Sequence, residues 1–383
     1  MRLRHQPALA ALALLAACGP QSTSFMTPLS AEQGALLTFI GRAAPTAADQ
    51  IRMSWPGTRL EFRFQGSGAA VDIRHRRGLF GGDSMRSWFD VVVDGTLVEP
   101  VAFGPDIGPK KITGALAAGD HTVTMTKRTE ALVGACDLFG LEIEAGTLMA
   151  PLARKERRIE VVSASAATGY GIEPIDCSKL GDLFDVAQNQ SRAWPQLLAD
   201  LLDAELMNTS FSGKGIVGVL FEPPGHRAMP ELYPLSDPSD LDSTPWTFTQ
   251  WAADAVLVDM SNIDWRANPT HQSADGSTGS GPEPAAYQRA NEAFVATIAG
   301  AYPKAKIYLL VSGVIEAENK PSIQAVLAAT AAASREKGID VQVHQMALAS
   351  GGRLACEQHP SVEMHQQMAQ DVAKRLQADL GWQ

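Results

Sequence analysis

Hydrophobic positions follow two different periods along the chain, and the change comes at the basic stretch 154–158. Between residues 34 and 146, short segments alternate apolar and polar residues, with turn signals such as Pro56-Gly57 and Asp94-Gly95 between them. The predicted strands are residues 51–55, 60–64, 70–73, 89–93 and 121–125. Evenly spaced short strands without a helical pattern of ten residues predict a β-sandwich.

After residue 158, continuous apolar runs alternate with segments of helical period. The predicted strands are residues 159–162, 255–260, 307–311 and 341–343, and the predicted helices are residues 191–205, 285–302, 322–337 and 362–380. Such alternation predicts a parallel sheet covered by helices. Residues 154–158 are interpreted as a solvated connection, and residues 268–284, rich in Gly, Ser, Thr and Pro, as a mobile surface loop near the site.

The first residues have the pattern of an export signal. Arg2 and Arg4 precede an apolar stretch, residues 8–17, that is shorter than the roughly 20 residues of a membrane-spanning helix. Residues 15–18 (Leu-Ala-Ala-Cys) resemble the bacterial lipoprotein cleavage box, in which Cys18 is lipidated and becomes the mature N-terminus. The alternative is an ordinary secretory signal that contains a chance cysteine. We expect an exported protein of the bacterial cell envelope, in the outer membrane or facing the periplasm, anchored to the membrane only by this lipid.

Length, charge and cysteines narrow the class of protein. The 383 residues are too many for one ordinary core, so we expect a signal at 1–18, a polar tether at 19–33, a sandwich at 34–148 and an α/β domain at 158–383. A net charge of −10 argues against a nucleic-acid partner. The cysteines form no CxxC pair and the histidines are scattered, so we expect neither a metal site nor a cofactor.

Ser165 and His359 are the candidate catalytic pair. Ser165 follows the predicted strand at 159–162, in the first loop after a buried strand, where an α/β sheet presents a nucleophile. His359 lies just before the last predicted helix, from which it can reach the same edge of the sheet. A hydroxyl and an imidazole are the minimum for acyl transfer. The alternatives are a small residue in a turn and a surface histidine.

Several short motifs occur in a fixed order along the chain. They are residues 41–42 (Gly-Arg), 55–57 (Trp-Pro-Gly), 92–95 (Val-Val-Asp-Gly), 127–130 (Lys-Arg-Thr-Glu), 212–215 (Ser-Gly-Lys-Gly), 254–264 and 356–365. Together they resemble carbohydrate esterase family 2 over nearly all of the mature chain. The resemblance implies an N-terminal all-β jelly roll, a C-terminal three-layer α/β hydrolase of the SGNH (GDSL-like) type with a flavodoxin-like sheet, and acetylated carbohydrates such as xylan or glucomannan as substrates.

The resemblance also implies roles for individual residues. Ser165 matches the family's nucleophile, His359 its base, and Gly213 its second oxyanion contributor beside Ser165 itself. Cys356 stands where an aspartate three residues before the histidine is expected. A backbone carbonyl or the nearby Glu357 is then expected to orient the imidazole.

Two departures weaken the match. The family's Gly-Asp-Ser block is Ser163, Ala164 and Ser165 here, and its Gly-Thr-Asn-Asp block is residues 261–264 with Ile263 in place of the asparagine. Losing one oxyanion donor typically costs about 100- to 1000-fold in turnover. Asn262, one position away, is a candidate replacement, although at a strand end it would point the other way. The rival hypothesis is therefore a weak or inactive homologue that binds glycans at the cell surface.

Other residues keep two interpretations open. Trp265 follows the third block and is a candidate sugar contact, whereas core packing is the commoner fate of a tryptophan. Cys177 and Cys356 both lie next to predicted site loops, either as a disulfide that pins the histidine loop or as separate thiols. We expect Cys136 to be a small buried apolar residue and His365 to be structural.

Overall fold

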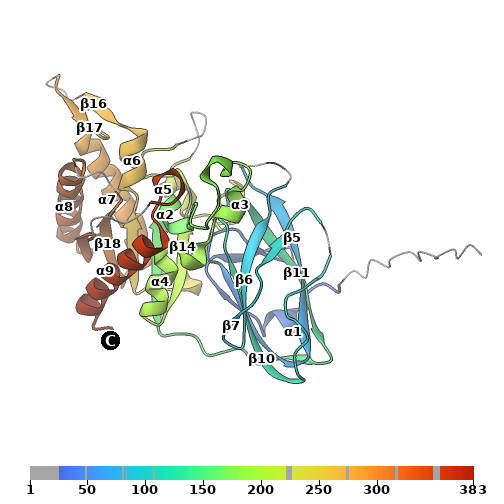
Figure 1. The fold of residues 1–383 in the computed structure, drawn as a ribbon. Coiled ribbons are helices and arrows are strands. Elements are labelled where there is room, and N and C mark those ends of the chain that lie inside the picture. Colours follow the sequence, from blue (N-terminus) through green and yellow to red (C-terminus); the bar gives the residue numbers. More distant parts are fainter. Residues whose placement is uncertain are drawn as a thin grey trace, which may run out of the picture.

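Two regions lie side by side in the molecule, a β-sandwich and an α/β region (Figure 1). The computed structural model describes residues 26–47, 50–79, 82, 84–106, 108–220, 227–272, 276–314, 318–347 and 354–383. The export signal, Cys18 and the tether as far as residue 25 lie outside these residues. None of the helices in the described ranges is both long enough and apolar enough to cross a bilayer.

The sandwich consists of two antiparallel sheets. One has the order β1-β4-β10-β6-β7, with β12 also paired to β4 and β8 to β6, and the other has the order β2-β3-β11-β5-β9. Alternate side chains of β4 face the core between the sheets, which explains the apolar and polar alternation of its sequence. The strands are β1 (Thr38–Ile40), β2 (Ala43–Ala47), β3 (Gln50–Met53), β4 (Arg59–Gly66), β5 (Gly68–Arg77), β6 (Ser87–Val93), β7 (Thr96–Leu97), β8 (Val101–Phe103), β9 (Lys110–Lys111), β10 (Gly119–Lys127), β11 (Gly134–Glu144) and β12 (Thr147–Met149).

The predicted tether extends too far. Met26 and Leu29 are buried, and the Leu29 N–H donates to the carbonyl of Phe139 at 2.8 Å. Ser30 then caps the short helix α1 (Ala31–Gly34). Residues 26–33 therefore belong to the sandwich, because their apolar side chains pack on it.

The α/β region has a five-stranded parallel sheet of order β14-β13-β15-β18-β19. This is the doubly wound 2-1-3-4-5 order expected for a flavodoxin-like sheet. Its strands are β13 (Arg157–Ser163), β14 (Ala204–Ser210), β15 (Ala255–Asp259), β18 (Lys306–Val311) and β19 (Val341–Gln345). Helices α7 (Pro284–Ala301) and α8 (Lys320–Glu336) cover one face, and α4 (Trp194–Leu201) and α9 (Val362–Leu380) cover the other (Figure 1). The predicted three-layer architecture is therefore present.

Short helices and turns connect these layers. They are α2 (Ser165–Thr168), α3 (Phe184–Ala187), α5 (Met229–Leu232), α6 (Ser261–Ala267) and the 3₁₀ turns η1 (Cys177–Lys179), η2 (Gln190–Arg192), η3 (Phe248–Gln250) and η4 (Cys356–Gln358). Residues 268–284, predicted as an irregular loop, contain the hairpin β16 (Thr270–Gln272) and β17 (Thr278–Ser280), which protrudes at the top left of Figure 1.

Several strands were missed in the sequence interpretation, among them two of the longer ones. The predicted helix at 191–205 ends at Leu201 and is followed by β14, whose seven residues are all buried although several are polar. Glu205 on β14 is buried because Arg154 pairs with both of its oxygens at 2.6 Å, so the basic stretch is not simply solvated. The longest strand of the sandwich, β11, is also absent from the prediction.

The two regions share a buried interface. The fully buried Arg42 of the sandwich donates from Nη2 to Glu160 Oε1 on β13 at 2.8 Å and from Nη1 to the Tyr233 carbonyl. Its guanidinium also lies 4.7 Å from the centre of the Tyr233 ring. Trp55 donates from its indole N–H to the Leu235 carbonyl at 3.3 Å. The motifs at 41–42 and 55–57 thus join the sandwich to the α/β region.

Candidate active site

Ser165 and His359 meet at the carboxyl edge of the parallel sheet. Ser165 begins α2 directly beyond β13, and His359 follows η4 just before α9. The Ser165 Oγ lies 2.8 Å from the His359 Nε2, within hydrogen-bond distance for proton transfer. The two residues are 194 positions apart in sequence, so the fold brings them together.

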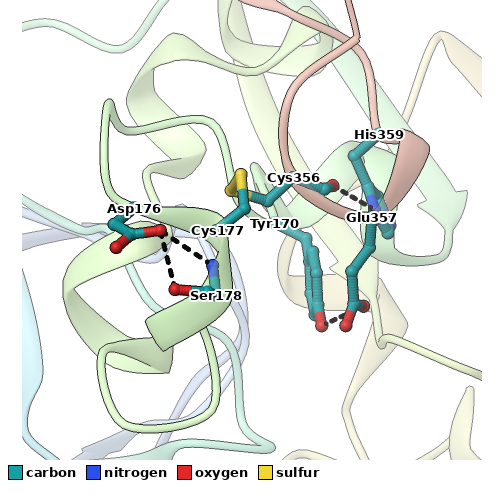
Figure 2. Close-up of a disulfide and its surroundings, with 7 residues drawn as sticks. All are labelled: Tyr170, Asp176, Cys177, Ser178, Cys356, Glu357 and His359. Atoms are coloured by element: carbon teal, nitrogen blue, oxygen red, sulfur yellow. Dashed lines mark hydrogen bonds between the residues drawn. A yellow bond between two sulfur atoms is a disulfide. The ribbon is translucent and has the colours of Figure 1, made fainter.

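A backbone carbonyl orients the imidazole. His359 Nδ1 lies 3.2 Å from the Cys356 oxygen (Figure 2). In this arrangement the Nδ1–H donates and leaves Nε2 as the acceptor that faces Ser165. The Glu357 carboxylate, named as the alternative orienter, instead accepts from the Tyr170 hydroxyl at 2.8 Å. The Tyr170 ring in turn stacks on the imidazole, with ring centres 4.3 Å apart. Glu357 therefore holds Tyr170 rather than a ring nitrogen of His359.

A disulfide anchors the histidine loop, defined here as residues 354–360. Cys177 and Cys356 are bonded, which decides between the two interpretations of these cysteines, and Cys136 is free and buried. Glu357 and Gln358 have positive φ angles of 50° and 61°, a conformation that costs energy for residues other than glycine. The loop therefore needs external anchors, and Figure 2 shows the disulfide beside Glu357 and His359.

The environment keeps His359 neutral. Burial lowers the pKa of its imidazole to about 4; the Cys356 carbonyl acts in the opposite direction, and the positive charge of Arg266 lowers the pKa further. An imidazole with this pKa is unprotonated at neutral pH and can accept a proton.

The pair opens into a cavity of about 300 Å³. Its wall consists of residues from α2, α6, the hairpin and the histidine loop, with a few from the connections between elements: Ser165, Ala166, Asn262, Trp265, Arg266, Pro269, Ser280, Val314, Glu318, Asn319, Gln358, His359 and Pro360. Trp265 fits both interpretations. It is only 6% exposed and contacts the Tyr287 ring edge-on at 5.2 Å between ring centres, and it also borders the cavity. Trp246 and Trp251 lie in the core.

Asn262 corrects an expectation from the sequence. Residues 261–267 form helix α6 rather than continuing a strand, so the argument that Asn262 points away does not hold. Its side chain lines the cavity with Ser165, and no described side chain or backbone group binds its amide. Ile263 is buried and does not line the cavity.

The turn that carries Gly213, residues 212–218, is called the oxyanion turn below. Gly213 is buried with φ +75°, and no group in the described ranges accepts from its N–H, although the residue is not part of the cavity wall. Buried Asp264 accepts from the N–H groups of Ile216, Val217 and Gly218 at 3.1, 2.9 and 2.8 Å. Burial raises the pKa of Asp264 to about 6, and these N–H groups oppose the rise. The sequence assigned no role to Asp264, although it belongs to the third block.

The remaining titratable side chains suggest no further catalytic or metal-binding role among the described residues. His365 is fully buried, and its Nδ1 accepts from the Trp194 N–H at 3.1 Å. Within the ranges that the structure describes, no group of three His, Cys, Asp or Glu side chains could hold a metal ion.

Comparison with known proteins agrees with this architecture. Residues 39–151 match a family model described as "Carbohydrate esterase 2 N-terminal". Over these residues the chain is similar to carbohydrate esterase family 2. The structure of a family two carbohydrate esterase from Clostridium thermocellum, in complex with cellohexaose, superposes with a TM-score of 0.79 at 21% identity, over 91% of this chain and 100% of that one. The two-domain fold inferred from the resemblance is thereby confirmed.

Two curated proteins are similar to this chain in sequence. Cellulase/esterase CelE of Acetivibrio thermocellus is 24% identical over 334 residues, which are 86% of this chain and 38% of that protein. An acetylxylan esterase / glucomannan deacetylase of Cellvibrio japonicus is 20% identical over 369 residues, 96% of each chain. The chain thus spans well under half of the first relative and nearly all of the second.

Proposed function

We propose that this chain is a serine esterase that removes acetyl groups from a carbohydrate. The observation that carries the proposal is the 2.8 Å contact between the Ser165 Oγ and the His359 Nε2 at the wall of an open cavity. The Cys356 carbonyl sets the tautomer, and the lowered pKa of His359 leaves its imidazole ready to act as base.

In the proposed reaction, the Ser165 oxygen attacks the acetyl carbonyl while its proton moves to His359 Nε2. The negative charge on the tetrahedral intermediate is stabilised by the backbone N–H groups of Ser165 and Gly213 and by the side-chain amide of Asn262. Asn262 here takes the role of the family's asparagine, whose position is occupied by Ile263. His359 then returns the proton to the departing sugar oxygen. A water repeats the sequence on the acetyl-enzyme and releases acetate.

The relatives support a carbohydrate substrate. Those named above are an acetylxylan esterase / glucomannan deacetylase and an esterase crystallised with cellohexaose, so acetylated xylan or glucomannan is the first class to test. Trp265 borders the cavity and offers an apolar surface to a sugar ring.

One observation favours a second candidate, a glycan-binding protein without turnover. The first block lacks its glycine and aspartate, and Ile263 removes the expected oxyanion donor. A cavity that still admits a sugar would then bind without cleaving. Retention of the contact between Ser165 and His359 favours the esterase.

The test is hydrolysis of 4-nitrophenyl acetate and of acetylated xylan and glucomannan by the chain from residue 26 onward. Ser165→Ala should lower kcat by at least about 1000-fold, whereas Ser178→Ala, on the exposed turn η1, should not. Equal background rates in the parent and in Ser165→Ala, together with measurable binding of xylan oligosaccharides, would establish the glycan-binding alternative.

We also propose that Cys18 is lipidated and holds the protein in a bacterial envelope. The support is the sequence of residues 1–18 alone. Expression of the full chain with an alkyne-bearing fatty acid should label the parent and not Cys18→Ser. Labelling of neither, with the parent recovered in the soluble periplasmic fraction, would indicate an ordinary secretory signal.

A further inference from the structure

A carboxylate of the sandwich reaches the oxyanion turn of the α/β region. Glu130 lies in the loop between β10 and β11 and is fully buried. Its Oε2 accepts from the Ser212 N–H at 2.7 Å, and its Oε1 accepts from the Ser212 hydroxyl at 2.5 Å. Ser212 directly precedes Gly213, so two short hydrogen bonds from another domain fix the start of the oxyanion turn.

The same carboxylate also contacts the nucleophile helix. Glu130 Oε1 lies 3.4 Å from the Thr168 hydroxyl, which also lies 2.9 Å from the Ser165 carbonyl on α2. Gln188 donates to Glu130 Oε1 at 2.8 Å and accepts from the Glu130 N–H at 3.0 Å. One buried side chain therefore links the two segments whose N–H groups would face the oxyanion.

The sandwich holds this carboxylate rigidly. Lys127 at the end of β10 is fully buried and donates to the Thr129 carbonyl at 2.5 Å, next to Glu130. The Lys127 carbonyl accepts from the Gly57 N–H at 2.8 Å. Burial raises the pKa of Glu130, while the hydrogen bonds from Ser212 and Gln188 and the charge of Lys127 favour its ionised form. The motifs 55–57, 127–130 and 212–215 thus meet in one network.

We propose that Glu130 is a positioning residue for the oxyanion hole, through which the sandwich completes the catalytic centre of the α/β region. The inference rests on the proposed esterase function. It assigns the sandwich a part in turnover beyond any role in carbohydrate binding. Donors that stabilise an oxyanion must already be in place before the charge develops, so a small displacement of the turn reduces the rate.

The chain offers a matched control at the same interface. Glu173, also largely buried, accepts from Arg128 of the sandwich at 3.0 Å and from Asn189 and Arg192 at 2.6 and 2.9 Å. None of its described partners belongs to the oxyanion turn or to α2. Replacing Glu173 therefore perturbs the interface without touching the proposed positioning contacts.

The experiment compares Glu130→Gln with Glu173→Gln. Glutamine has one acceptor oxygen and cannot accept from the Ser212 N–H, the Ser212 hydroxyl and Gln188 together. For Glu130→Gln we expect kcat on 4-nitrophenyl acetate to fall about 10- to 100-fold with KM nearly unchanged, whereas Glu173→Gln should stay within about threefold of the parent. Thermal unfolding of both variants identifies any loss of folded protein.

A second measurement does not depend on turnover. Amide hydrogen exchange of residues 212–218 should quicken in Glu130→Gln and stay slow in Glu173→Gln. Ser212→Ala and the double variant Glu130→Gln/Ser212→Ala complete a double-mutant cycle. The loss of kcat in the double variant should be much smaller than the product of the two single losses.

The outcomes separate the two proposals. No Ser165-dependent turnover in the parent, with faster exchange confined to Glu130→Gln, overturns the esterase function and leaves the coupling of Glu130 to the turn. Equal losses of kcat in the two variants, or unchanged exchange at 212–218 in Glu130→Gln, overturn the positioning role.

Discussion

The oxyanion turn and the histidine loop both lie at the carboxyl edge of the parallel sheet, yet they are held in different ways. Buried carboxylates hold the turn, Glu130 from the sandwich and Asp264 from α6, each through several hydrogen bonds. A disulfide and an aromatic stack hold the loop, in which Glu357 and Gln358 are exposed. The difference follows from the task, because an oxyanion donor is a backbone group and needs a fixed chain, whereas a base needs only an oriented ring.

The strongest test of this comparison is Asp264→Asn. The amide can accept on one oxygen only, and its NH₂ group would face backbone N–H donors. We expect the free energy of unfolding to fall by about 3 kcal/mol and kcat to fall by about 100-fold or more as the turn loosens. Chemical denaturation and steady-state kinetics measure the two effects.

Asp259 supplies the control for that prediction. It is also a buried aspartate, its pKa is raised to about 7 by burial, and its Oδ1 has no partner among the described residues. Asp259→Asn should therefore leave kcat within a few-fold of the parent. If both variants lost activity equally, burial of a carboxylate in this region, rather than its hydrogen bonds to the turn, would be the cause.

Removing the disulfide should have a smaller effect on turnover. In Cys177→Ser/Cys356→Ser the loop loses its covalent anchor, and we expect about a tenfold loss of kcat with a loss of about 2 to 5 kcal/mol in unfolding free energy. Reduction of the parent should reproduce both changes, because the remaining Cys136 is buried. Full kcat in the reduced parent would show that the stack of Tyr170 on His359 suffices.

The pH dependence tests the environment of the loop. The neutral imidazole is the active form, so kcat/KM should be constant above about pH 6 and fall as pH drops through the lowered pKa of His359, about 4. Arg266→Gln removes a positive charge that lowers this pKa, and the acid limb should then move upward. A limb near 6.5 in the parent, the ordinary histidine value, would contradict the burial of the ring.

The smallest expected effect concerns Tyr170. Tyr170→Phe removes the hydrogen bond to Glu357 and keeps the stacked ring, so kcat should fall only about two- to fivefold. Tyr170→Leu removes the stack as well and should cost more. Equal rates for the two variants would show that the ring itself contributes nothing to orienting His359.

Sequence patterns predicted the helices and strands whose buried side chains are mostly apolar. Helix α9 was predicted with its exact ends, because its hydrophobic period is unbroken. Strand β14 was missed because its buried polar residues depend on distant partners, such as Arg154 for Glu205 and Glu160 for Thr209. No local pattern reveals a partner about 50 residues away.

The candidate site shows the same limit. Ser165 and His359 could be proposed because a strand end, a helix start and a family resemblance marked them locally. The positions of Asn262, Glu130 and Asp264 depend on where α6 and the oxyanion turn lie in space. No pattern in the sequence separates α6 from the preceding strand. Motif 127–130 was recognised without a role, because its partner Ser212 is 82 residues away.

The pair of Arg42 and Glu160 limits how this architecture can be recombined. Its guanidinium comes from the sandwich and its carboxylate from β13 of the parallel sheet, both without solvent contact. Exchanging the sandwich for a foreign domain would leave the buried Glu160 without an opposite charge, with hydroxyls such as those of Thr209 and Tyr233 as its remaining hydrogen-bond donors, a penalty of several kcal/mol. The α/β region therefore cannot be combined freely with other domains, and a chimera must keep residues 42 and 160 together.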